Sequence, residues 1–179
     1  YHKNLMKTGM RIVSPGCREE APFGWLEEFN NKCVAQDVRI DVIAVHWYDW
    51  GAVLDSNTSN DTGLSAFNRF KSYLTSVYNL YGLPIWITEF NANPARSAAV
   101  NLDFMNLALP YLESLFYVER YNWFADSDGI DSNSFYEPNG TTLTTLGNAY
   151  KNQVSTPSVT GNTVDAINNL NVSSCLNCN

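Results

Sequence analysis

The fold is decided by the stretch Leu83-Pro84-Ile85-Trp86-Ile87-Thr88-Glu89-Phe90-Asn91, which predicts a short buried β-strand ending in a carboxylate. Its isoleucines and aromatic residues favour a strand, and Glu89 lies where that strand runs out. The catalytic carboxylates of β/α barrels lie at the C-terminal ends of parallel strands. Glu89 is therefore a candidate catalytic residue, although a surface glutamate is the commoner occupant of a strand end.

Four segments have the β-branched and aromatic composition of parallel-sheet strands: residues 10–14, 41–47, 85–90 and 118–124. Helical patterns lie between them at residues 23–35, 64–81 and 97–116, and a last one covers 143–151. Gly82 and Pro84 end the second helix, Ser97 caps the third and Pro110 bends it. Residues 1–9 are expected to end a preceding helix. This alternation predicts an α/β chain with right-handed crossovers.

The composition narrows the classes of partner. With 16% charged and 13% aromatic residues, the chain is expected to be globular with an aromatic-lined surface or cleft. Its net charge of −7 disfavours nucleic acid and anionic membranes, which require clustered Lys and Arg. No run of 18 apolar residues is present, so no membrane span is predicted, and no signal peptide is predicted either. Because the sequence starts at Tyr1 rather than Met, we expect a processed or partial product.

The cysteines predict disulfides rather than a metal site. Their spacing fits no zinc pattern, and the chain has only two histidines, so neither a metal nor another cofactor is expected. Of the three possible pairings, Cys17–Cys33 with Cys175–Cys178 is the first choice.

Glycosylation sequons, like the predicted disulfides, indicate a secreted protein. Four Asn-x-Ser/Thr sequons begin at Asn57, Asn60, Asn139 and Asn171, all in segments expected to be loops. They favour a secreted glycoprotein, extracellular or in a cell wall. Residues 152–179 are rich in Ser, Thr and Asn and are expected to form a tail or linker after the folded segment 1–151.

Polar and aromatic residues follow the predicted strands at their ends. Parallel strands bring these ends to one face, so the following residues could converge there: His46, Tyr48, Glu89, Asn91 and Trp123. Rings that stack on sugar faces, beside polar groups that bind hydroxyls, form a carbohydrate cleft. A histidine in an apolar strand is more often a core residue, and Trp47, Trp86 and Phe90 are expected to be core.

Glycoside cleavage requires a second carboxyl group, about 5–5.5 Å from the first for retention of configuration and farther for inversion. No other carboxylate has the strand-end placement of Glu89. The weaker candidates in the sequence are Glu19, Glu20, Asp49, Glu119, Asp126 and Asp128.

Five motifs occur in a fixed order: GMRIVSP (9–15), IAVHWY (43–48), PIWITEF (84–90), YVERYNWF (117–124) and LGNAY (146–150). Together they resemble the glycosyl hydrolase catalytic core of glycoside hydrolase family 128, the endo-β-1,3-glucanases, over residues 1–151. The resemblance implies a (β/α)8 TIM-type barrel that cleaves β-1,3-glucan with retention. By motif, Glu89 corresponds to the nucleophile, and His46, Tyr48, Trp123 and, less closely, Asn91 correspond to substrate-binding positions.

One family motif is absent. The acid/base glutamate of the family lies on the fourth strand within Asn-Glu-Pro, which this sequence lacks. The resemblance therefore implies that the chain covers strands five to eight. The remaining half would come from a longer chain, from a partner or by self-association. The alternative function is a secreted structural or carbohydrate-binding glycoprotein of an extracellular matrix or filament, with a non-catalytic hydrolase fold.

Overall fold

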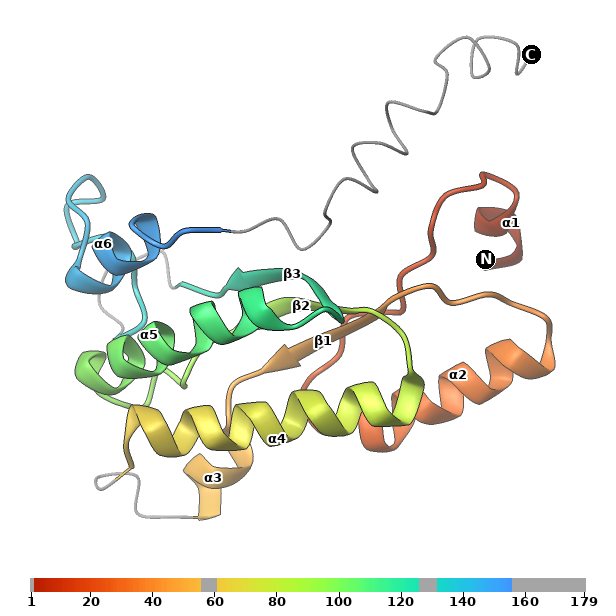
Figure 1. Cartoon of the computed structure of the whole chain (residues 1–179), viewed down its shortest axis with the longest axis horizontal. Helices are drawn as coiled ribbons and strands as arrows, with labels where there is room; N and C mark the ends of the chain where they lie inside the picture. The colour runs from red at the N-terminus through yellow and green to blue at the C-terminus, as the bar shows by residue number, and fades with distance from the viewer. Residues whose placement is uncertain (1, 56–60, 126–131, 156–179) are drawn as a thin grey trace, which may run out of the picture.

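The computed structural model describes residues 2–55, 61–125 and 132–155 (Figure 1). Its centre is a three-stranded sheet in the order β1-β2-β3, formed by β1 (Ile43–Trp47), β2 (Ile85–Phe90) and β3 (Val118–Trp123). Both strand pairings are parallel. The predicted α/β class with a parallel sheet is thus confirmed, and β2, the strand that carries Glu89, lies in the middle.

The predicted strand at residues 10–14 is wrong as a regular strand. This segment makes two isolated parallel bridges to the edge of the sheet, Val13 with Val42 and Cys17 with Val45. Between the bridges lies Pro15, which has no N–H to donate to a ladder. The segment nevertheless follows the free edge of β1, where the His46 N–H donates to the Cys17 carbonyl at 2.7 Å.

The predicted helices are present with small boundary shifts, and one short helix was not predicted. The elements are α1 (His2–Met6), η1 (Ala21–Phe23), α2 (Trp25–Ala35), α3 (Trp50–Asp55), α4 (Gly63–Tyr81), α5 (Ala98–Ser114) and α6 (Thr145–Lys151), with α3 the unpredicted one. The Thr62 and Ser97 side chains accept from the first-turn amides of α4 and α5. Gly82 ends α4 at a φ of 62°, a conformation that glycine adopts without strain.

The core lies between the sheet and the two long helices. Figure 1 shows α4 and α5 side by side, both antiparallel to the strands. Phe70 of α4 and Phe104 of α5 are fully buried, and both contact Trp47 of β1 and Phe90 of β2. Because side chains alternate along a strand, His46 and Trp86 project from the face opposite these helices.

The predicted Cys17–Cys33 disulfide is wrong: both are free, buried thiols. The Cys17 thiol points at the Ala44 carbonyl, 3.7 Å away in β1, whereas Cys33 lies in the last turns of α2. Burial raises the pKa of both thiols, that of Cys17 to about 11. Cys175, Cys178 and three of the sequons (Asn57, Asn60 and Asn171) lie outside the described residues, whereas Asn139 is exposed.

Two further observations bear on partners. Within the described ranges, no helix is both long and apolar enough to cross a bilayer. In the same ranges, no three His, Cys, Asp or Glu side chains are grouped so that they could hold a metal ion.

Candidate active site

Three of the predicted site residues meet at the C-terminal end of the sheet. The Tyr48 hydroxyl donates to Glu89 Oε2 at 2.6 Å, and His46 Nδ1 lies 3.4 Å from the same oxygen. The Glu89 side chain is 35% exposed, so a ligand can reach it. Among the described residues, both polar partners of Glu89 approach Oε2, which leaves Oε1 for a reacting atom.

A β-bulge in β2 brings Glu89 to this site. Val45 pairs with Ile87, but the next residue, His46, pairs with Glu89, so Thr88 is an extra residue. Without it, strict alternation would turn Glu89 toward α4 and α5 and Phe90 away from them. The bulge reverses the alternation, so that Phe90 is fully buried and Glu89 joins His46 on the opposite face.

Tyr48 remains a hydrogen-bond donor throughout the physiological pH range. Burial raises the pKa of the Tyr48 phenol far above its ordinary value, and the hydrogen bond to Glu89 and the charge of its carboxylate raise it further. A protonated phenol can therefore hold one carboxylate oxygen in place while the other reacts.

Gly16 lets the segment beside β1 approach His46 closely. A Cβ at this position would lie 3.1 Å from His46 Nε2 and 3.3 Å from the Thr88 hydroxyl. A residue with a Cβ would require the imidazole or the Thr88 side chain to shift. Gly16 therefore helps to fix the ring that faces Glu89.

Two predicted substrate-binding residues are buried behind the site rather than exposed in it. Asn91 is 0% exposed, and its amide donates to the Phe124 carbonyl at 2.9 Å. Trp123 is 7% exposed, and its indole donates to the Asn133 carbonyl at 3.1 Å. The aromatic ring exposed at this strand end is Phe124, which is 47% exposed and contacts Tyr48 edge-on at 5.9 Å.

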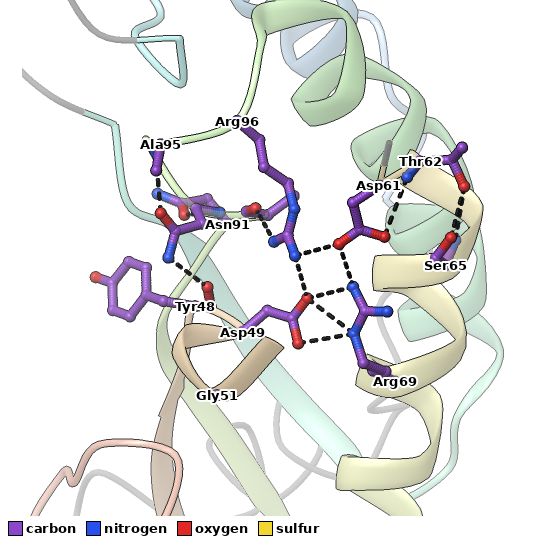
Figure 2. Close-up of polar contacts among 12 residues, drawn as sticks. Tyr48, Asp49, Gly51, Asp61, Thr62, Ser65, Arg69, Asn91, Ala95 and Arg96 are labelled. Carbon is purple, nitrogen blue, oxygen red and sulfur yellow. Dashed lines mark hydrogen bonds and ion pairs between the residues drawn. The ribbon is translucent and has the colours of Figure 1, made fainter. Parts of the chain in front are cut away.

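A largely buried charge cluster, comprising Asp49, Asp61, Arg69 and Arg96, begins at the residue after Tyr48 (Figure 2). Arg69 Nη2 lies 2.7 Å from Asp49 and 2.6 Å from Asp61. Arg96 Nη2 lies 2.8 Å from Asp49 and also pairs with Asp61. The cluster joins the end of β1, the start of α4 and the loop after β2. No sequence pattern predicted it, because its members are far apart in the chain.

Electrostatics in this cluster favours the ionised forms. Burial alone raises the pKa of Asp61, but the charges and hydrogen bonds of Arg96 and Arg69 outweigh burial and hold that pKa below its ordinary value. The hydrogen bond to Asp49 raises the pKa of Arg69.

The other carboxylates considered from the sequence have partners elsewhere. Both oxygens of Glu19 accept backbone N–H groups, from Tyr48 at 2.8 Å and Gly51 at 3.2 Å. Glu119 pairs with Arg11 at 2.9 Å near the opposite end of the sheet. Burial raises the pKa of Glu119, but hydrogen bonds from Arg11 and Trp86 hold it below its ordinary value. Glu20 forms an exposed pair with Arg18, whereas Asp126 and Asp128 lie outside the described residues.

A family model and several solved structures place the chain among glycosyl hydrolases. A family model described as the glycosyl hydrolase catalytic core matches residues 1–150. The endo-β-1,3-glucanase of Amycolatopsis mediterranei, a subgroup I member of glycoside hydrolase family 128 solved with laminaritriose, is 34% identical with a TM-score of 0.65. A subgroup II endo-β-1,3-glucanase of Sorangium cellulosum is 26% identical, also with a TM-score of 0.65. Alkali-sensitive linkage protein 1 of Schizosaccharomyces pombe is 35% identical over 135 residues.

The similar region is a part of each relative. The alignment with the Amycolatopsis enzyme covers 83% of this chain and 61% of that one, and with the Sorangium enzyme 82% and 56%. The alignment with the Schizosaccharomyces protein covers 70% of this chain and 22% of that protein. The chain thus spans less than two thirds of the length of these relatives.

Proposed function

Because the chain belongs to the glycosyl hydrolase catalytic core family, we propose that it carries the nucleophile half of a retaining endo-β-1,3-glucanase active site. The observation that carries this proposal is the placement of Glu89. Its carboxylate lies at the C-terminal end of the central parallel strand, half-open to solvent, with Tyr48 and His46 both on Oε2. Such strand ends are where barrel enzymes place catalytic groups.

The proposed reaction takes place at Glu89 Oε1, because Tyr48 and His46 both lie on Oε2. Glu89 Oε1 attacks the anomeric carbon of a β-1,3-linked glucose unit, and the bond from that carbon to the leaving oxygen breaks. An acid/base carboxyl protonates the leaving oxygen. The same group then takes a proton from water, which attacks the anomeric carbon, releases Glu89 and restores the original configuration. Tyr48 holds Oε2 throughout, so Oε1 keeps its orientation.

The acid/base group belongs to the part of the site that this chain does not supply. We assign residues 1–151 to strands five to eight of a (β/α)8 barrel, with the segment that bridges the edge of the sheet at Val13 and Cys17 in the place of strand five, and residues 152–179 to a tail or linker. Two features support this: the face of the sheet opposite α4 and α5 carries the site, and the similar glucanases are longer. The first half of the barrel, from a longer chain, a partner or a second copy, would supply the acid/base glutamate.

Substrate class and location complete the proposal. The Amycolatopsis enzyme was solved with laminari-oligosaccharides, and the exposed Phe124 ring beside Tyr48 offers a surface on which a glucose unit can stack. The predicted sequons, of which Asn139 is exposed, favour a secreted glycoprotein of the cell exterior or wall.

The test uses the protein with its complete barrel and laminarihexaose as substrate. Glu89→Gln should reduce the hydrolysis rate by roughly four to six orders of magnitude, the range seen when a nucleophile is removed. Glu20→Gln, at an exposed position, is the matched control and should hydrolyse at the wild-type rate. Absence of hydrolysis in the wild type, or equal rates for Glu89→Gln and wild type, would show that this function is wrong. Glucan binding without cleavage would favour the carbohydrate-binding glycoprotein.

A further inference from the structure

Tyr48 is held through its backbone on both sides. Its N–H donates to Glu19 Oε2 at 2.8 Å, and its carbonyl accepts from Asn93 Nδ2 at 2.9 Å. Neither bond is a sheet hydrogen bond, because β1 ends at Trp47. Tyr48, which orients Glu89, therefore lies just beyond the end of β1. Its backbone is bound by the side chains of Glu19 and Asn93 instead of by a neighbouring strand.

We propose that Glu19 and Asn93 are positioning residues that keep the Tyr48 hydroxyl on Glu89. The proposal rests on the function proposed above. Glu19 reaches from the segment beside β1, and its second oxygen accepts the Gly51 N–H at the start of α3. It thus fixes the turn after Tyr48 as well as Tyr48 itself.

Burial and hydrogen bonds fix the orientation of the Asn93 side chain. It is 0% exposed, and its side-chain oxygen accepts the Ala95 N–H at 2.9 Å while its amide nitrogen serves Tyr48. The Asn93 N–H donates to Asn91 Oδ1 at 2.7 Å, and its carbonyl accepts from Asn101 at 3.1 Å. Asn93 therefore has one orientation, and that orientation fixes the carbonyl of Tyr48.

Backbone conformation supports the same conclusion. In the part of the chain that the structure describes, positive φ angles of non-glycine residues occur at Asp37, Asp49 and Asn93. Asp49 directly follows Tyr48, and Asn93 donates to the Tyr48 carbonyl. This conformation is unfavourable for residues with a Cβ and persists where surrounding contacts enforce it, often at functional sites.

The positive φ at Asp49 has a visible consequence. The angle of 57° turns the chain so that the Asp49 side chain enters the charge cluster while the Tyr48 ring points away from it (Figure 2). The Tyr48 hydroxyl donates to Glu89 instead. Arg69 and Arg96 contact the Asp49 carboxylate there. The charge cluster thus fixes the backbone immediately after Tyr48, while Glu19 and Asn93 fix Tyr48 itself.

A double-mutant cycle tests the proposal in the protein with its complete barrel. Glu19→Ala removes one contact; Asn93→Gly removes the other and keeps a residue that tolerates the φ of 85°. Each should lower kcat on laminarihexaose by 10- to 100-fold and change KM less than 2-fold. Glu20→Ala, next to Glu19 and exposed, is the control and should have wild-type kcat.

The second arm of the cycle uses Tyr48→Phe as background. If Glu19 and Asn93 act through the Tyr48 hydroxyl, adding either change to Tyr48→Phe should cost less than 2-fold, because the hydroxyl is already absent. A merely structural role predicts the same loss in both backgrounds, and that result would overturn the proposal. Thermal unfolding of each variant identifies any that fail to fold.

A crystallographic measurement separates this inference from the proposed function. If the wild type does not hydrolyse glucan, or if Glu89→Gln is fully active, the function fails, yet the geometry can still be measured. In crystals of Glu19→Ala and Asn93→Gly, the Tyr48 hydroxyl should move from 2.6 Å to beyond 3.5 Å from Glu89 Oε2. An unchanged distance in both variants would show that neither residue positions Tyr48.

Discussion

Arg96→Met should destabilise the fold strongly, because Arg96 is the buried cation of the charge cluster. The Arg96 side chain is 1% exposed, and those of Asp49 and Asp61 are 6% and 10% exposed. Its second terminal nitrogen, Nη1, also donates to the Ala92 carbonyl at 2.6 Å. Methionine fills similar volume but leaves two buried carboxylates facing one guanidinium.

The magnitude follows from this imbalance. Removing one partner of a buried ion pair typically costs about 3–5 kcal/mol. Arg69 still contacts both carboxylates and its side chain is 39% exposed, so the uncompensated charge is partly solvated. We therefore expect a loss of about 3 kcal/mol, at the lower end of that range. For a domain of this size it corresponds to a fall in Tm of roughly 6–12 °C.

The loss should depend on pH in a definite direction. Because the pKa of Asp61 is held below its ordinary 3.8 in the folded state, its ionised form stabilises the fold above that value. The contribution disappears as pH falls through the folded-state pKa. Without Arg96 the depression is weaker, so the Tm gap between wild type and Arg96→Met should be largest at pH 7 and narrow below pH 3.8.

Calorimetry at pH 7 and pH 3 measures both effects, with Arg96→Lys as the matched control. Lysine retains the positive charge and should lose clearly less stability than methionine. A Tm gap below about 3 °C at pH 7 would show that the cluster is not a buried electrostatic unit. So would a gap of the same size at both pH values.

Three further tests concern the packing of the aromatic core, the close approach of α4 to α5, and the state of the Cys17 and Cys33 thiols. Phe104→Ala should cost about 3–5 kcal/mol in urea unfolding, because the ring is fully buried in the aromatic core; a loss below 1 kcal/mol would contradict that packing. Gly63→Ala should lower the free energy of unfolding by roughly 1–3 kcal/mol, because its Cβ would lie 2.6 Å from the Phe104 backbone nitrogen. Gly51→Ala is the control and should not destabilise the fold, because a Cβ there would have no atom within 4 Å. Cys17 and Cys33 should react with iodoacetamide in denaturant without a reductant, because both are free thiols. If the peptides of both cysteines stay unmodified, the disulfide predicted from the sequence would be correct.

Local signals explain why most of the framework could be predicted from the sequence. Helix α4 shows a periodic apolar stripe and stops at a glycine followed by Leu-Pro, so its end was predicted to the residue. The strands β1 and β2 are short, mainly apolar runs between such helices, whereas β3 combines Val, Tyr and Trp with charged residues. The segment at residues 10–14 has similar composition but forms only isolated bridges. Composition alone does not reveal how many ladder hydrogen bonds a segment makes.

Side-chain direction explains what the sequence could not predict about the site. Strand-end position brought His46, Tyr48 and Glu89 together correctly. For Asn91 and Trp123 the same rule gave the right end of the sheet but did not give the direction of the side chain. Because one inserted residue inverts the alternation, a bulge invisible in the sequence decides which side chains face a ligand.

The arrangement divides the proposed chemistry unevenly between this chain and the rest of the barrel. The contacts found around Glu89 orient the proposed nucleophile: the bulge turns it outward, Tyr48 holds Oε2, and Glu19 and Asn93 hold Tyr48. All of these contacts are made within one sheet, the segment beside β1 that carries Glu19, and the loops after β1 and β2. The orientation of Glu89 should therefore not depend on the first half of the barrel, whereas cleavage requires the proton that the other half donates. A complete barrel lacking only its acid/base carboxyl should accordingly keep the 2.6 Å contact between Tyr48 and Glu89 while losing hydrolysis.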